Sequence, residues 1–150
     1  ITNNLNGFNI LQTMRLKLIL LAGWIIVQAI CLLKTGIVEK GESLKYINEA
    51  LLFANGGQFS QPKYLFYSVY IAIRLFFEEA GLGATGVYIF QLLLNLVSLF
   101  FFYKLSIRYF NSERSAKIAA LRLIVCLPWQ LWTTHLYTES VFINLVIIFS

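Results

Sequence analysis

Two long apolar runs without a charged residue, residues 18–33 and residues 86–103, constrain this chain more than any other feature. An α-helix rises about 1.5 Å per residue, so each run with its flanks approaches the roughly 30 Å of a bilayer's hydrocarbon core. Basic residues flank the first run at both ends, and Ala29-Ile30-Cys31 near its end is a poor site for signal cleavage. We therefore predict that both runs form retained membrane-spanning helices.

The composition points to the same class of protein. Hydrophobic residues make up 59% of the chain and charged residues 13%, whereas soluble domains have about 45–50% and about 25%. These values exclude a water-soluble enzyme domain and a disordered chain. Both cysteines, Cys31 and Cys126, lie in apolar runs, which excludes a disulfide scaffold. The predicted fold class is all-α, with several transmembrane helices.

Two more segments are predicted to enter the membrane. Residues 118–134 form a third span, with Arg122 near its start and Pro128 at a position where proline can kink a helix. Residues 140–150 form the beginning of a fourth span. Together with the first two spans, they predict that the chain threads the bilayer several times.

The chain is expected to be the N-terminal fragment of a longer protein. Residues 1–150 would form the first part of one transmembrane domain, with its first two spans at about residues 18–34 and 86–104. Either Ile1 or Met14 would be the true start.

A loop of about 50 residues, residues 35–85, separates the first two spans. Residues 42–54 place apolar side chains at helical spacing, which predicts an amphipathic helix lying against a membrane surface or another helix; these side chains are Leu44, Ile47, Leu51 and Ala54. Asn55-Gly56-Gly57 is expected to end that helix.

Residues 64–77 form a shorter apolar run that is harder to assign. Fourteen residues are more typical of an interfacial or re-entrant segment than of a span, and a charge inside the run is costly in lipid. That charge belongs to Arg74, and a salt bridge to Glu78 is its simplest structural explanation. The tyrosines of this run are predicted to form an interfacial belt; they are Tyr64, Tyr67 and Tyr70.

Charge asymmetry orients the predicted spans. Residues 104–122 carry five basic residues and one acidic residue, whereas residues 34–79 carry five of each. The basic turn and the N-terminus are therefore expected in the cytoplasm, and the long loop outside. This topology brings Glu42 and Glu139 to the same outer face. If residues 64–77 did span, the two glutamates would lie on opposite sides.

Motifs of soluble enzymes are absent from the sequence: there is no GxGxxG, P-loop, HExxH, CxxC or GxSxG pattern. One histidine, His135, cannot form a His-rich metal site. The basic excess is expected to face anionic lipid, and no nucleic acid partner is expected.

The long loop carries a more informative pattern. Glu42, Tyr46, Ala50 and Gly56 resemble the acidic-x-x-x-Tyr-x-x-x-Ala…Gly signature of the first outer loop in membrane glycosyltransferases of the GT-C fold. Dolichyl-phosphate-mannose protein mannosyltransferases and lipid A aminoarabinose transferases belong to this group. Three further segments resemble its later motifs in the same order along the chain; they are residues 61–64, 103–116 and 128–139.

The resemblance implies an inverting transfer of a sugar from a polyprenyl-phosphate donor to a protein, lipid or glycan acceptor on the outer face. It implies Glu42 as the base and Glu139 as a second acid that orients the acceptor or a divalent cation, Mg²⁺ or Mn²⁺. Lys63 and Arg74 would bind the donor phosphate, and Tyr46 would contact substrate. A bacterial inner membrane with a periplasmic active face is expected. The fragment alone is expected to be inactive, because later helices complete the family's site.

Other interpretations of the same residues stay open. Glu42 and Glu139 are each placed where an acid stabilises a helix N-terminus, and Lys63 can extend toward lipid headgroups. A transporter would use membrane-embedded polar residues as a pathway, and interhelical hydrogen bonding is the simpler role for the first two of them; these residues are Gln91, Asn95 and Arg122. A non-catalytic membrane subunit is the third possibility.

Overall fold

The chain is all-helical in a computed structural model that describes residues 3–39, 41–136 and 138–150. The side chains of residues 3–14, 16, 42, 43, 65 and 66 lie outside this description. Helices account for 83% of the chain, and no strand forms among the described residues. The predicted all-α class is therefore confirmed.

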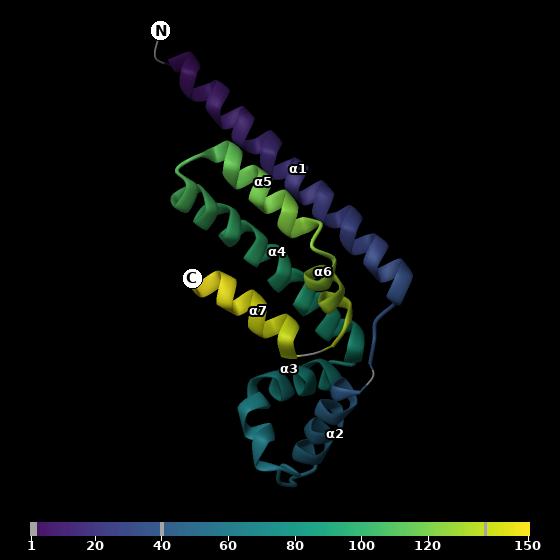
Figure 1. The fold of residues 1–150 in the computed structure, drawn as a ribbon. Helices are drawn as coiled ribbons and strands as arrows, with labels where there is room; N and C mark the ends of the chain where they lie inside the picture. Colours follow the sequence, from purple (N-terminus) through teal and green to yellow (C-terminus); the bar gives the residue numbers. More distant parts are fainter. Residues whose placement is uncertain (1–2, 40, 137) are drawn as a thin grey trace.

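The longer bundle helices run side by side, and a short helix, α6 (Leu127–Thr134), lies at one end of them (Figure 1). The longer helices are α1 (Asn3–Thr35), α4 (Gly83–Phe110), α5 (Glu113–Ile124) and α7 (Thr138–Phe149). In this bundle α5 packs against both α1 and α4, whereas α7 packs against α4. Because α5 follows α4 through a tight turn at Asn111, the two helices form an antiparallel hairpin.

The predicted outer loop forms a helical unit at one end of the bundle (Figure 1). It contains α2 (Glu42–Ala54), the 3₁₀-helix η1 (Pro62–Tyr67) and α3 (Ser68–Glu79). The α3 helix packs on α2 and on α4, which fixes the unit to the bundle. The α4–α5 turn lies at the opposite end of the molecule.

Among the described residues, two helices are long and apolar enough to cross a membrane: the Lys17–Thr35 part of α1, and α4. Only 22% and 39% of their most apolar windows are buried, respectively, whereas the core helix of a soluble protein is mostly buried. Large apolar side chains remain exposed along both helices and along α7, as a lipid-facing surface requires; examples are Ile25, Ile26, Leu93, Val97 and Phe142.

The segment predicted as a third span is not one helix. It divides into α5 and α6, with a break at Val125 and Cys126. Pro128 explains the break, because its ring has no N–H and clashes with the carbonyl of the residue four positions earlier, Ile124. The α3 and α7 helices have 12 residues each, so residues 64–77 supply no continuous helix of spanning length.

The predicted amphipathic helix has the expected bounds but a different buried face. Tyr46, Glu49 and Ala50 are buried in the structure, whereas Leu44 and Leu51 are each 48% exposed. The packing surface of α3 is aromatic, so it selects the tyrosine side of α2 and leaves the leucines facing outward. Glu49 accepts a hydrogen bond from the Ser60 backbone N–H at 2.9 Å, which ties down the turn after α2.

Buried polar side chains link the bundle helices to one another. The Trp24 indole of α1 donates to Asn95 Oδ1 of α4 at 2.7 Å, and Ser98 donates to Asn144 Oδ1 of α7 at 2.6 Å. Gln28 of α1 likewise donates to Gln130 of α6. The predicted interhelical role of Asn95 is confirmed, and these bonds fix the relative positions of four helices.

Candidate functional site

Two linkers that are far apart in sequence meet at the end of the bundle that carries α2 and α3. The Val38 N–H donates to the Thr134 carbonyl at 2.9 Å, and the Leu136 N–H donates to the Val38 carbonyl at 3.2 Å. This short parallel bridge joins the linker after α1 to the linker before α7. The first loop therefore lies beside the segment that leads to Glu139.

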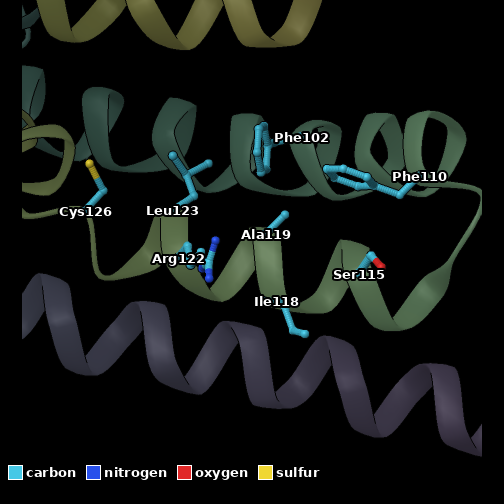
Figure 2. Close-up of a pocket in the computed structure, with 8 residues that line it drawn as sticks. All are labelled: Phe102, Phe110, Ser115, Ile118, Ala119, Arg122, Leu123 and Cys126. Atoms are coloured by element: carbon cyan, nitrogen blue, oxygen red, sulfur yellow. The ribbon is translucent and has the colours of Figure 1, made fainter.

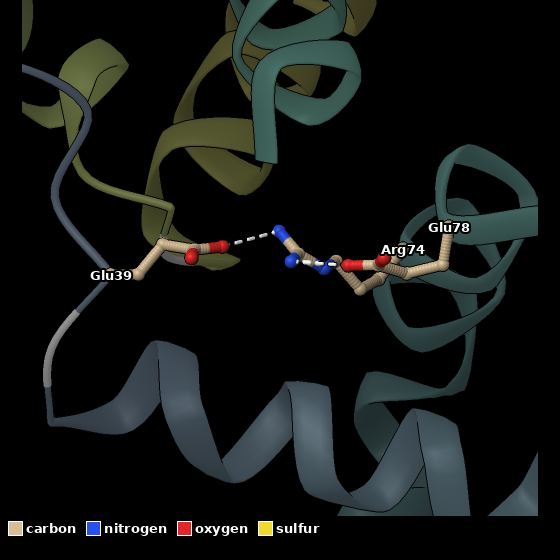
Figure 3. A network of polar contacts seen from close by, with 3 residues as sticks. All are labelled: Glu39, Arg74 and Glu78. Carbon is tan, nitrogen blue, oxygen red and sulfur yellow. Dashed lines mark hydrogen bonds and ion pairs between the residues drawn. The ribbon is translucent and has the colours of Figure 1, made fainter. Parts of the chain in front are cut away.

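A buried arginine ties the first of these linkers to α3. Arg74 Nη1 lies 2.7 Å from Glu39 Oε1, and Arg74 Nη2 lies 2.5 Å from Glu78 Oε1 (Figure 3). Arg74 is only 4% exposed, whereas the two carboxylates are about one-third exposed. The predicted i,i+4 salt bridge is confirmed, and Glu39 is an additional partner that the sequence did not reveal.

Four tyrosines surround the contact between α2 and α3. The Tyr46 ring centroid lies 6.3, 5.2 and 5.4 Å from the centroids of Tyr64, Tyr67 and Tyr70, at steep interplanar angles typical of favourable aromatic pairs. The Tyr46 hydroxyl also lies 3.4 Å from Thr138 Oγ1 at the start of α7. Tyr64 and Tyr70 are each 5% exposed, so these two do not form the predicted surface belt.

A pocket of about 610 Å³ opens beside this tyrosine cluster. Its walls include the rings of Tyr67, Tyr70 and Trp132, and Glu139 contributes its carboxylate. Glu139 is exposed, and its Oε2 accepts a hydrogen bond from Thr138 Oγ1 at 3.3 Å. The pocket thus combines aromatic faces from the first loop with a carboxylate from the helix that begins the final segment.

Burial keeps the Tyr70 phenol neutral beside this carboxylate. Loss of solvent raises the pKa of Tyr70 well above its usual value near 10; the Arg74 charge opposes this shift, and Tyr46, Glu39 and Glu139 add to it. Tyr70 lines the Glu139 pocket and lies one helical turn before Arg74 on α3.

The structure brings together three of the five residues singled out in the sequence. Tyr46, Arg74 and Glu139 lie around Tyr70 at one end of the molecule. Lys63 is exposed on η1, with its Nζ 5.3 Å from the centroid of the Tyr64 ring, and it does not line the Glu139 pocket.

Glu42 is the first residue of α2, directly after Gly41. Gly41 has a φ of 61°, a conformation that glycine adopts without strain, and this allows the sharp turn into the helix. The Glu42 side chain lies outside the described part of the chain, so its role as a base stays a prediction.

Sequence reasoning missed Glu39, Tyr67 and Trp132 as site residues. The burial cost of Arg74 required anionic partners, but it did not specify one that lies 35 positions away in the sequence. Trp132 lines the pocket from α6, and its position in an apolar run gave no signal of a site.

The described carboxylates do not form a divalent-cation site. No group of three or more His, Cys, Asp or Glu side chains comes together in the part of the chain that the structure describes. Glu39 and Glu78 are both engaged by Arg74, which leaves Glu139 as the one carboxylate that lines the pocket. The Mg²⁺ or Mn²⁺ ion that the resemblance implies stays a prediction.

The fold and the site define an all-helical protein with two helices long enough to cross a membrane and a pocket at one end of its bundle. No family model, curated protein or solved structure matches the chain. The resemblance to GT-C glycosyltransferases therefore rests on the sequence motifs alone.

Proposed function

We propose that this chain forms part of a multi-pass membrane glycosyltransferase that moves a sugar from a polyprenyl-phosphate donor to an acceptor hydroxyl. The pocket around Glu139 is the observation that supports the proposal. It combines aromatic side chains of the first loop with a carboxylate at the start of α7. Sugar rings present apolar C–H faces and hydroxyl edges. Aromatic rings with a few placed polar groups suit such a ligand.

The chemistry requires little from the protein besides positioning and proton transfer. The acceptor hydroxyl attacks the anomeric carbon of the donor, and the bond from that carbon to the phosphate oxygen breaks. Polyprenyl phosphate leaves with the bonding electrons, and the configuration at the anomeric carbon inverts. A carboxylate accepts the hydroxyl proton. We assign this base to Glu42, following the family resemblance, and the orientation of the acceptor to Glu139.

The two cations that the resemblance implicates, Arg74 and Lys63, then receive different roles. Arg74 is buried and already pairs with two carboxylates, so we assign it to holding the Glu39 linker against α3. Lys63 is an exposed ammonium on the same loop, so it is our candidate for binding the donor phosphate. Tyr46 contacts two residues that line the pocket, Tyr70 and Thr138, so we assign it to supporting the pocket wall.

Carboxamide substitutions test this proposal. The protein at its natural length is reconstituted in membranes with polyprenyl-phosphate mannose or aminoarabinose, and the transferred sugar is measured. We expect Glu42→Gln and Glu139→Gln each to lower transfer by about 10²-fold or more, because general-base catalysis contributes that much. The matched control is Glu79→Gln, which changes an exposed glutamate at the end of α3 and should leave transfer unchanged. Unchanged transfer in both Glu42→Gln and Glu139→Gln would contradict the proposal.

The transporter alternative is weakened by where its polar residues lie. Asn95 is fully buried and accepts the Trp24 hydrogen bond, and Gln91 is also fully buried. Arg122 lies on the exposed side of α5. A pathway needs its polar groups along one accessible route, whereas these residues are divided between the interior and the outer surface.

A further inference from the structure

A second pocket lies at the hairpin between α4 and α5, away from the Glu139 site (Figure 2). Its volume is about 510 Å³. Phe102 and Phe110 line it from α4, Ile118 and Leu123 line it from α5, and Cys126 closes the end next to α6. The walls are therefore almost entirely apolar.

Arg122 is the one charged side chain among these lining residues, and the Ser115 hydroxyl is a further polar group. It lies between Leu123 and Ala119 on the α5 wall (Figure 2). No hydrogen bond or ion pair joins Arg122 to another residue in the described part of the chain. Arg122 is exposed, so in a membrane its unpaired guanidinium would meet lipid, where a charge is costly unless an anion accompanies it.

No carboxylate is among the described residues that line this pocket. Glu113 is the one acidic residue in the sequence from residue 80 to residue 138. It pairs with Lys117, whose Nζ lies 3.2 Å from its Oε1, and it accepts a longer hydrogen bond from the Tyr103 hydroxyl. Five basic residues stand against this one acid on residues 104–122, so the hairpin carries a strong positive excess.

The surroundings of the pocket favour a lipid over a soluble anion. Apolar residues that neighbour Arg122 and Cys126 in the sequence are exposed: Leu121 at 43%, Val125 at 63% and Leu127 at 57%. In a membrane this belt meets acyl chains. Side chains of a helix lean toward its N-terminus, so Arg122 extends toward the basic end of the hairpin, where headgroups would lie.

We propose that this pocket binds one anionic phospholipid, with its phosphate on Arg122 and an acyl chain along Phe102 and Leu123. Bidentate contact with phosphate oxygens is the geometry that guanidinium groups favour. The lipid would bridge α4 and α5 on the bundle's outer surface and would be distinct from any donor lipid at the Glu139 end. The proposal requires only that the hairpin lies in a membrane, and it is independent of sugar transfer.

The test measures lipid retention on the purified protein at its natural length. Protein in detergent is loaded with phosphatidylglycerol or phosphatidylcholine, and bound lipid is counted by native mass spectrometry. We expect Arg122→Gln to lower phosphatidylglycerol retention about fivefold, the size expected for one basic residue near a membrane surface, whereas Arg122→Lys should retain most of the lipid. Arg114→Gln is the matched control, because it removes an exposed charge from the same helix outside the pocket. Equal losses in the Arg122→Gln and Arg114→Gln variants would overturn the proposal.

Cys126 supplies an independent readout, because it is exposed at the pocket whereas Cys31 is buried. Phosphatidylglycerol should slow maleimide labelling of Cys126, and phosphatidylcholine should not. Protection by free glycerol phosphate instead would identify a soluble-anion site and overturn the lipid assignment. Ala119→Leu keeps the charge but fills the pocket, so it should also reduce retention. These outcomes do not depend on transfer activity, so failure here and failure of the transferase proposal are distinguishable.

Discussion

Arg74 shows how one side chain can join two parts of a chain. Its burial in the first loop would be unfavourable without anionic partners, and Glu39 and Glu78 provide two. Replacing Arg74 with Met leaves two neighbouring carboxylates without their cation. We expect a loss of about 3 kcal/mol in the free energy of unfolding, measured as a lower thermal midpoint in detergent. Arg108→Met, which changes an exposed arginine of α4, should have little effect, and an equal loss there would contradict the special role of Arg74.

The sequence could predict part of this residue-level arrangement. A charge inside an apolar run required compensation, and the i,i+4 spacing identified Glu78 as a partner. Glu39 was not predictable, because its approach depends on the bridge between Val38 and His135. The burial of Tyr64 and Tyr70 was also hidden, because an aromatic residue at an interface and one in a small core give the same local pattern.

The corner between α3 and α4 depends on a glycine, because the two helices approach each other closely there. A Cβ on Gly86, in the first turn of α4, would lie 2.4 Å from Phe77 Cδ1 and 2.9 Å from Leu82 Cβ. We expect Gly86→Ala to displace Phe77 and cost about 1–3 kcal/mol. Gly23→Ala in α1 is the matched control, because nothing lies within 4 Å of its added Cβ, and alanine should stabilise that helix by up to about 1 kcal/mol.

Thermal unfolding in detergent measures both glycine variants. The two substitutions add the same methyl group to a glycine in an apolar helix, so opposite changes in the thermal midpoint would identify the α3–α4 corner as the cause. A tolerated Gly86→Ala would show that Phe77 moves aside at little cost.

Element bounds were predictable wherever a local signal ended the helix. The bounds of α2 follow from its helical spacing and from the Asn55-Gly56-Gly57 turn. The division of residues 118–134 into α5 and α6 was not predicted. A hydropathy average over the segment does not show the break, and Pro128 indicated a kink within one helix. The buried face of α2 depended on the aromatic surface of its partner helix, which a single helix cannot reveal.

The molecule as a whole has two chemically different ends. The end with α2 and α3 carries the tyrosine cluster and the Glu139 pocket, whereas the opposite end carries the basic α4–α5 turn (Figure 1). Charge counting along the sequence anticipated that Glu139 and the first loop share one end. It did not anticipate the direct contacts between them, which require the bridge at Val38 and the Tyr46–Thr138 approach.

This separation predicts the topology in a membrane. Single cysteines are introduced by Asn55→Cys, Glu139→Cys and Arg114→Cys in a chain whose native cysteines are replaced by alanine; all three positions are exposed. A membrane-impermeant maleimide added outside intact cells should label the first two, and the third only after the membrane is opened. The reason is the positive excess around Arg114, which retains that turn in the cytoplasm. Labelling of Asn55→Cys and Glu139→Cys from opposite sides would separate the first loop from the Glu139 pocket, and a shared active site would then be impossible.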